Sequence, residues 1–572
     1  MRSMTDLGMR RTIIMIALGG ALPLPGGCYT GLSLEATPAA SGGDAGPVED
    51  GGGDEDGDSE GPEGGEEREP ITMRRLTRFE YDNTVLALLG DDSEPAQVFP
   101  PEERVDAFDN NATALTFPPV MAEQAMSTGR RLADRIAVDL ESWVPCGTQD
   151  LDCGRQFIED LGSRAWRRPM EDDEIERLID VFAHGMQSEG FERGVQMAAH
   201  AILISAPFFY RVERGDGQAV EGKPGLMRPS SWEMASRLSY LLWGEPPDET
   251  LWQAAEADAL REPAQIQAQV DRLIADPRAR RAVARFHLLW LGLEPVDSIA
   301  KDPERFVDWS PDLPKSFRAE LDAFVDDVFW SPGGSIEQLL TASHSFVDGP
   351  LAAFYGLEGG APGGEQLVRV QLDPSRRAGL LTRPGLLALH AGFDQTSPTH
   401  RGLLVRQQLL CDVMPPPPPE VDDTPTEPTD DQTTRGRVEE HTSNETCAPC
   451  HSLIDPIGFA FEHYDATGAF REDEHGLAID ARGEATDSDV GEFDGLEQLG
   501  RALADSADVR RCVATQWYRY AYGRREDETL DGPAVVDELD ATLEDTGGDL
   551  QALLRALTRT DAFLYMPMPE AE

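Results

Sequence analysis

Two cysteines and a histidine in one short motif could hold a metal cofactor. The motif is Cys447-Ala-Pro-Cys450-His451, in which two residues separate the cysteines and the histidine follows at once. This spacing is typical of c-type haem attachment, where the two thiols add to the haem vinyl groups and the adjacent imidazole binds the iron as the proximal ligand. The sequence therefore predicts that Cys447 and Cys450 hold haem c and that His451 ligates its iron.

Two other interpretations of this motif stay open. A CxxC pair can form a structural disulfide or remain reduced, and His451 would then be incidental. A zinc site is the second alternative. Because zinc needs four ligands and the chain has no second CxxC, that site would have to recruit single histidines from nearby, namely His441, His463 or His475.

The sequence does not choose the distal haem ligand. A methionine in that position would give a high-potential electron carrier, whereas an open position would permit peroxide chemistry. The candidates are the same three histidines together with Met414, Met566 and Met568. No spacing in the chain distinguishes among them.

The elements around the motif have to position it. A helix over about residues 435–441 is expected to lead the chain to Cys447, and another is expected over 403–410. The stretch Asp455-Pro-Ile-Gly458 is expected to turn the chain soon after the motif, and a role near the haem edge is the alternative. His400 and Arg401 are expected at the surface, which is the default for polar side chains.

The N-terminus has the features of an export signal. Three arginines in the first eleven residues precede a short apolar stretch, Thr12–Leu24, and small residues then lead to Cys28. This resembles a bacterial lipoprotein cleavage box, so residues 1–28 are predicted to be a signal peptide and Cys28 to carry a lipid that anchors the protein in a membrane. Ordinary secretion is the alternative. The expected location is periplasmic or at the cell surface.

Export would place the remaining cysteines in an oxidising compartment, where disulfides form. With Cys28 and the motif set aside, four cysteines allow three pairings. The short polar loop between Cys146 and Cys153 favours a local bridge, which leaves Cys411 and Cys512 to close a long loop around the motif.

The charge of the chain excludes some partners. The net charge is −55, and the tract Ser41–Pro70 alone holds twelve acidic residues against one arginine. Such a surface repels nucleic-acid phosphates and anionic lipids, so no nucleic-acid partner is expected. Residues 29–70 are predicted to be a disordered acidic linker because they contain almost no large apolar residue.

The rest of the chain predicts a mainly α, multidomain helical body with a small cytochrome-c-like C-terminal unit and few short strands. Capping boxes at Thr77–Glu80 and Ser230–Glu233 mark helix starts, and the run 365–372 is strand-like. His287 lies on an apolar helix and is expected to pack in a core. The expected domains are residues 71–144, 145–214, 225–358, a CxxCH-bearing domain at 365–475, and 490–565.

With this order laid out, the chain resembles a family of large exported bacterial proteins. Members are built from five domains of unknown function in series, with a cytochrome-c-like haem-binding signature in the fourth. The resemblance implies a haem-bearing extracytoplasmic protein and says little about a substrate. One departure is His463, where the family favours asparagine. The matching stretches are 75–84, 164–169, 205–213, 235–243, 377–381, 396–402, the proline run 415–419, 447–468 and 510–523.

Two function classes follow. The first is an exported, lipid-anchored c-type haem protein that transfers electrons to a redox partner or acts on an unknown substrate. The second is a non-redox surface lipoprotein, a scaffold or binding protein whose CxxC is a structural disulfide. Hydrolysis has little support, because the chain has neither a Gly-x-Ser-x-Gly elbow nor an HExxH zinc helix.

Overall fold

The computed structural model describes most of the chain beyond the predicted linker. The described residues are 73–144, 146–357, 366–415, 429, 431–443, 447–526 and 532–568. All of them fall within one unit, Glu67–Glu572. The predicted signal peptide with Cys28, the acidic linker and prolines 416–419 lie outside the described residues.

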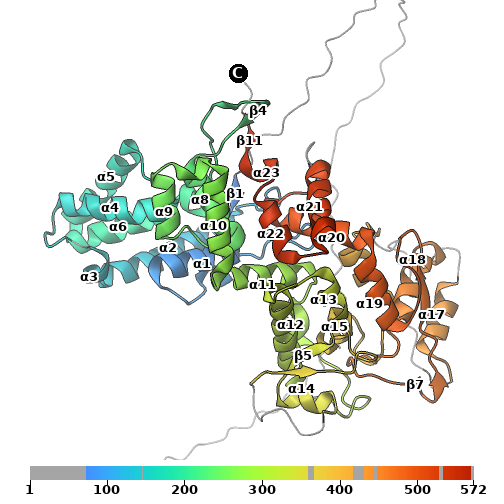
Figure 1. Ribbon diagram of the computed structural model, residues 1–572. Coiled ribbons are helices and arrows are strands. Elements are labelled where there is room, and N and C mark those ends of the chain that lie inside the picture. Colours follow the sequence, from blue (N-terminus) through green and yellow to red (C-terminus); the bar gives the residue numbers. More distant parts are fainter. Residues whose placement is uncertain are drawn as a thin grey trace, which may run out of the picture. The chain divides into compact units, whose positions relative to one another are not determined.

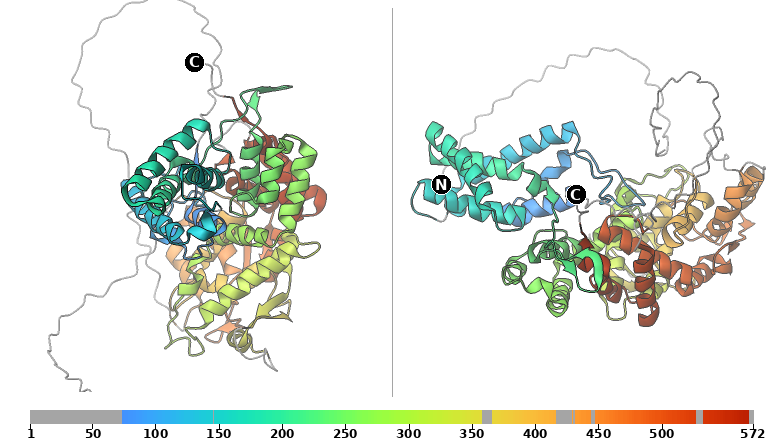
Figure 2. Two further views of the ribbon diagram at one scale, coloured as in Figure 1. Left: turned by 90° about the vertical axis from the view of Figure 1, so that its left-hand side faces the viewer. Right: turned by 90° about the horizontal axis from the view of Figure 1, so that it is seen from above.

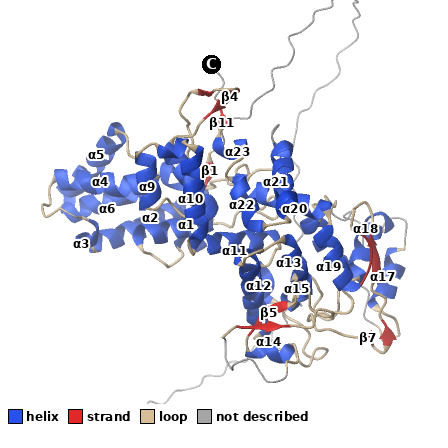
Figure 3. Ribbon diagram, viewed as in Figure 1, coloured by secondary structure: helices blue, strands red, loops and turns tan. Residues whose placement is uncertain are grey.

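The described chain is mainly α-helical, as predicted, and its strands are short (Figure 3). The first helix shows how local sequence sets the boundaries. Helix α1 (Arg78–Leu89) begins at the predicted capping box, in which the Thr77 side chain and the Glu80 carboxylate each accept the other residue's backbone N–H. It ends at Gly90, which has a φ of 65°.

The N-terminal segment packs its helices around one hydrophobic core. Tyr81, Phe208 and Phe209 lie in this core, with the ring of Tyr81 stacked on that of Phe209. The first disulfide, Cys146–Cys153, joins the loop before α4 to its first turn, as predicted. The elements are β1 (Arg74–Arg75), η1 (Pro95–Val98), α2 (Pro119–Val138), α3 (Leu140–Trp143), α4 (Leu151–Trp166), α5 (Asp172–Glu189), α6 (Phe191–Leu203), α7 (Ala206–Phe209) and β2 (Tyr210–Arg211).

The middle segment begins with a small sheet and continues as helices. Ser230 and Glu233 form the second predicted capping box, which starts α8. The predicted strand over 365–372 is found as β6 (Val368–Gln371), antiparallel to β5. The elements before β6 are β3 (Ala219–Val220), β4 (Lys223–Met227), α8 (Ser231–Leu242), α9 (Glu249–Glu256), η2 (Ala259–Arg261), α10 (Pro263–Ala275), α11 (Arg278–Trp290), η3 (Glu294–Ser298), α12 (Leu313–Trp330), α13 (Ile336–Thr341), β5 (His344–Val347) and α14 (Gly349–Phe354).

The segment that carries the motif has short helices and two-stranded sheets. Its helices are η4 (Leu380–Thr382), α15 (Pro384–Leu389), α16 (Pro398–Leu404), the π-helix η5 (Val405–Leu409), α17 (Thr434–Thr442) and α18 (Ala448–Phe459). The strands β7 (Asp473–Glu474) and β8 (Leu477–Ala478) pair with each other, as do β9 (Arg482–Ala485) and β10 (Gly491–Asp494).

The C-terminal segment runs back along the earlier parts of the chain. Strand β11 (Met566–Pro567) pairs with β4, so that residues far apart in sequence lie side by side (Figures 1 and 2). Trp517 stacks on Phe286 of α11 with ring centroids 3.8 Å apart. The other C-terminal elements are α19 (Gly495–Asp505), α20 (Ala507–Tyr522), α21 (Gly532–Thr546), α22 (Leu550–Leu557) and α23 (Asp561–Leu564).

The second disulfide, Cys411–Cys512, is also present as predicted. It joins the chain just after η5 to helix α20, and the loop that it closes contains the Cys447–His451 motif. A single large core extends from α8 through the motif-bearing segment to α23, so the three later predicted domains share their packing.

No helix among the described residues has the length and apolarity needed to span a membrane.

His287 lies in the large core, as expected from its apolar helix. It is 2% exposed, and its Nδ1–H donates to the Val283 carbonyl at 2.9 Å. Burial lowers the pKa of His287 to about 4. In the unfolded chain the His287 imidazole has a pKa of 6.5, so below that pH it binds a proton that it does not bind in the folded protein. His287 therefore lowers the free energy of unfolding as the pH falls from 6.5 towards 4.

We expect the wild type to lose about 2 kcal/mol of unfolding free energy between pH 7.5 and pH 5 relative to His287→Leu, since 1.5 pH units at 1.36 kcal/mol each separate pH 5 from 6.5. Urea unfolding of both proteins at the two pH values measures this difference. An equal acid sensitivity of the two would show that this imidazole is not kept neutral by burial.

Candidate functional site

The motif lies at the start of helix α18 (Figure 1). Cys447 immediately precedes the helix, and Cys450 and His451 are in its first turn, where the His451 N–H donates to the Cys447 carbonyl at 3.1 Å. Both cysteines are half-buried. Neither takes part in the two disulfides described above.

His451 is held by a carboxylate on its own helix. Its Nδ1 lies 3.0 Å from Oδ2 of Asp455, one turn along α18. Because a carboxylate only accepts, Nδ1 carries the proton and donates, which leaves Nε2 as the nitrogen available to a metal. This hydrogen bond raises the pKa of His451.

The expectation that residues 455–458 turn the chain is wrong. These residues lie inside α18, with Pro456 in the helix interior. Pro456 lacks the N–H that a helix normally uses, but contacts from neighbouring elements hold the backbone here. As a result Asp455 stays in helical register with His451 and reaches its ring.

Helices α16 and α18 run antiparallel, and their backbones are in close contact. Pro398 faces Gly458 and Ile454 faces Gly402. A Cβ on Gly458 would lie 1.9 Å from the Pro398 carbonyl oxygen, and one on Gly402 would lie 2.2 Å from that of Ile454. Only glycine fits at these two positions. Between them, Thr399 Oγ1 donates to Oδ1 of Asp455 at 2.8 Å.

Strand β9 approaches the same helix equally closely. A Cβ on Gly483 would lie 1.9 Å from the Pro456 carbonyl oxygen. The backbone around Pro456 is thus confined by β9 as well as by α16.

The expectation that Arg401 lies at the surface is also wrong, whereas His400 is exposed as expected. Arg401 is 0% exposed. Its guanidinium donates to four backbone carbonyls, and these belong to Leu387, Phe461, Tyr464 and Asp465. The side chain therefore fixes the segment that leaves the C-terminal end of α18.

A second buried arginine holds the middle of α18. Arg406, 2% exposed, lies in the π-helix η5 and donates to the carbonyls of Leu453 at 3.0 Å and Thr486 at 2.7 Å, and to Asp412 at 2.9 Å. Single π-helical turns are frequent at functional sites. Here the wider turn carries the side chain that joins α18 to the residues after β9.

Charged residues behind α18 form a buried network. Glu462, 2% exposed, accepts from Arg471 at 2.9 Å and from Thr396 at 3.0 Å. Glu474, 5% exposed, accepts from the backbone and the hydroxyl of Thr434 at the start of α17. Burial raises the pKa of Glu462. The network connects α16, α17 and the chain after α18.

Three of the candidate distal ligands have other partners in the structure. Met566 and Met568 belong to the strand pair of β11 and β4, where Met566 pairs with Met227. His463 follows α18, where its Nδ1–H donates to the Arg471 carbonyl at 3.1 Å and its ring stacks on Phe470. The choice of distal ligand stays a prediction.

The zinc alternative finds no support in the part of the chain that the structure describes. Within that part, no three or more histidine, cysteine or acidic side chains come together as a metal site.

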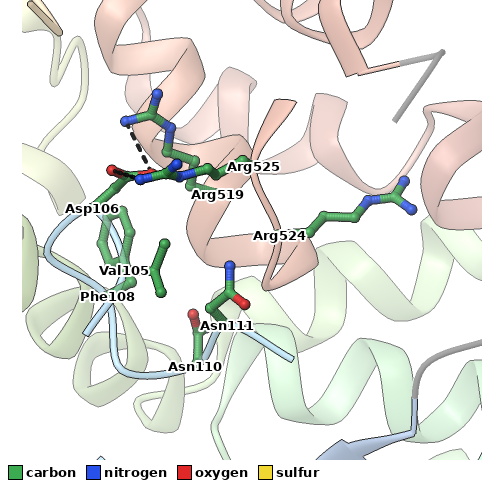
Figure 4. A pocket seen from close by; sticks show the side chains of 8 residues that line it. All are labelled: Val105, Asp106, Phe108, Asn110, Asn111, Arg519, Arg524 and Arg525. Atoms are coloured by element: carbon green, nitrogen blue, oxygen red, sulfur yellow. Dashed lines mark hydrogen bonds and ion pairs between the residues drawn. The ribbon is translucent and has the colours of Figure 1, made fainter. Parts of the chain in front are cut away.

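Two pockets of the described structure have no residue of the motif in their walls. One is a crevice between the 105–111 loop and the end of α20, where Asp106 accepts from Arg525 at 2.6 and 2.9 Å and faces Arg519 (Figure 4). It encloses about 0 Å³ of volume open to water-sized probes, and the ion pairs of Asp106 join the loop to the residues around the end of α20. The other is a depression of about 370 Å³ between α13 and α19.

Sequence reasoning missed the residues that position His451. The four-residue spacing of His451 and Asp455 was visible, because residues four apart share a helix face. Thr399, Gly402 and Arg401 are near one another in sequence, but nothing in the sequence indicates that they face α18.

The fold and site thus define a mainly helical protein whose CxxCH motif opens a helix that buried arginines and close glycine contacts hold in place. Five family models match this chain in series, and the chain belongs to the family built from these five domains. Each model is described as a protein of unknown function: DUF1587 over residues 74–138, DUF1595 over 153–213, DUF1592 over 230–357, DUF1588 over 377–474 and DUF1585 over 490–563. No curated protein and no solved structure matches the chain.

Proposed function

We propose that this protein is an exported, lipid-anchored c-type haem protein that transfers electrons or carries out redox chemistry on an unknown substrate. Cys28 would carry the lipid, in keeping with the sequence before it. The observation that supports a haem most strongly is the donor set at the start of α18: two half-buried thiols with the attachment spacing, and an imidazole whose Nδ1 is already engaged.

The residues present fit a haem by their chemistry. Cys447 and Cys450 would hold it by thioether bonds, and His451 would present Nε2 to the iron. A bound haem would supply a one-electron redox centre. The protein's part is to orient the imidazole through Asp455 and to hold α18 through Arg401 and Arg406.

A non-redox scaffold is the alternative. It would use Cys447 and Cys450 as a structural disulfide. The Asp455 contact favours the haem proposal, because a scaffold has no need of an oriented imidazole beside the two cysteines.

A pyridine haemochrome spectrum tests the proposal. The full chain is expressed with a cytochrome c maturation system, beside Cys447→Ala/Cys450→Ala. We expect a c-type α-band in the wild type and its complete loss in the double variant. Cys146→Ala/Cys153→Ala is the matched control, since it also removes two cysteines, and it should keep the band. A folded wild-type protein without covalent haem would refute the proposal and leave the scaffold as the better account.

A further inference from the structure

We propose that Asp455 is a positioning residue that makes His451 a strong electron donor and so stabilises ferric over ferrous haem. The inference rests on the proposed haem function. It adds that the haem has a low reduction potential and not that of a high-potential carrier.

The contact itself is the first step. Oδ2 of Asp455 accepts from His451 Nδ1 at 3.0 Å, and Oδ1 accepts from Thr399 at 2.8 Å. Asp455 is 3% exposed. Both carboxylate oxygens therefore have fixed partners in a site from which water is largely excluded, where hydrogen bonds to charge are strengthened.

The histidines in the described structure differ in their partners. His344 also faces a carboxylate, with its Nε2 2.9 Å from Oδ2 of Asp327, but two others do not. His287 and His463 each donate from Nδ1 to a backbone carbonyl, of Val283 and Arg471 respectively. His451 instead faces a carboxylate, which carries a full negative charge and pulls more strongly on the Nδ1 proton than a carbonyl does.

The site is also rigid enough to hold this geometry. Asp455 and His451 are one turn apart on α18, so helix geometry sets their separation. Thr399 is fixed against Asp455 by the glycine contacts of α16 with α18 on either side of it. A rotation of the carboxylate away from His451 would also break its hydrogen bond to Thr399.

The electronic consequence follows from general metal-site chemistry. A carboxylate on the far side of a histidine ligand fixes its tautomer and raises its basicity. A more basic ligand, together with a nearby buried negative charge, favours the more positive ferric ion. Haem potentials are set by such axial-ligand and hydrogen-bond effects.

The test is the haem midpoint potential of the intact holoprotein, measured by spectroelectrochemical titration. In Asp455→Asn we expect the ratio of ferrous to ferric haem at a given applied potential to rise at least tenfold. For one electron this corresponds to a rise of about 59 mV in the midpoint potential. Thr399→Val removes the hydrogen bond to Oδ1 and keeps the carboxylate. More negative charge is then left for the oxygen that faces His451, so the potential should fall below that of the wild type, by less than the rise in Asp455→Asn. Asp480→Asn is the control. It also removes one negative charge, but from a partly exposed side chain that pairs with Arg482.

The outcomes separate the two proposals. A wild type without haem refutes the haem proposal and with it this inference. Haem-loaded variants whose potentials equal that of the wild type overturn the inference alone. If Asp455→Asn does not fold, Thr399→Val decides, and an unchanged or raised potential in that variant overturns the inference as well.

Discussion

Replacing Arg401 with lysine is expected to cost at least about 3 kcal/mol of unfolding free energy, because each buried carbonyl left without a donor costs about 1–3 kcal/mol. Arg401 donates to four carbonyls, two of them at 2.8 Å, and it faces Glu462 at 3.8 Å. A lysine has one ammonium and cannot reach all of these oxygens. Burial lowers the pKa of Arg401 to about 10, so the guanidinium is still charged at neutral pH and its partners depend on it.

Urea unfolding measures this loss, and hydrogen exchange locates it. The amides of α18 and of residues 460–465 should exchange faster in the variant, because Arg401 holds the chain that leaves this helix. Arg482→Lys is the control: its side chain is 72% exposed, and it should unfold within about 0.5 kcal/mol of the wild type. Equal urea-unfolding midpoints for Arg401→Lys and the wild type would contradict this prediction, because the four carbonyls would then accept hydrogen bonds from other donors.

Replacing Gly458 with alanine should destabilise the protein by about 3 kcal/mol, the upper part of the usual range for overpacking. Helix propensity alone would predict that this substitution stabilises the protein, because alanine is favoured over glycine by about 1 kcal/mol inside a helix. The reversal comes from the Pro398 carbonyl oxygen, which would lie 1.9 Å from the new Cβ. That oxygen is backbone and cannot rotate away, so α16 would have to move as a whole.

Gly436→Ala provides the matched control in helix α17. Its nearest neighbours are atoms of the Gln432 side chain, at 3.0 and 3.2 Å, and a flexible side chain can shift. This variant should be neutral or slightly stabilised in urea unfolding. A stabilised Gly458→Ala would contradict the close crossing of the two helices.

The sequence predicted well the features that depend on local signals. The helix that starts at the Thr77 capping box and the Cys146–Cys153 bridge each rest on residues within a few positions of one another. The Cys411–Cys512 bridge was predicted only because it remained once the local pair was formed. The mainly helical class follows from many such local signals added together.

The candidate site was predicted less completely, for two physical reasons. Pro456 indicated a turn after Asp455, because proline usually ends a helix. The helix continues because α16 and β9 confine it, and that support is tertiary. Arg401 was expected at the surface because charged side chains are rarely buried without partners. Its partners are carbonyls from two separate stretches of chain, which no local pattern in the sequence reveals.

The return of the C-terminus to β4 has a consequence for synthesis. Asp561 pairs with Lys223, 338 residues earlier, next to the strand pair of β11 and β4. At about 5–20 residues per second a ribosome needs roughly 20–70 s to bridge that gap. Throughout this interval β4 has no β11 to pair with, and for much of it Phe286 has no Trp517 to cover it. The growing chain thus presents an open strand edge and an aromatic surface, the kind of exposed surface that favours aggregation before folding is complete.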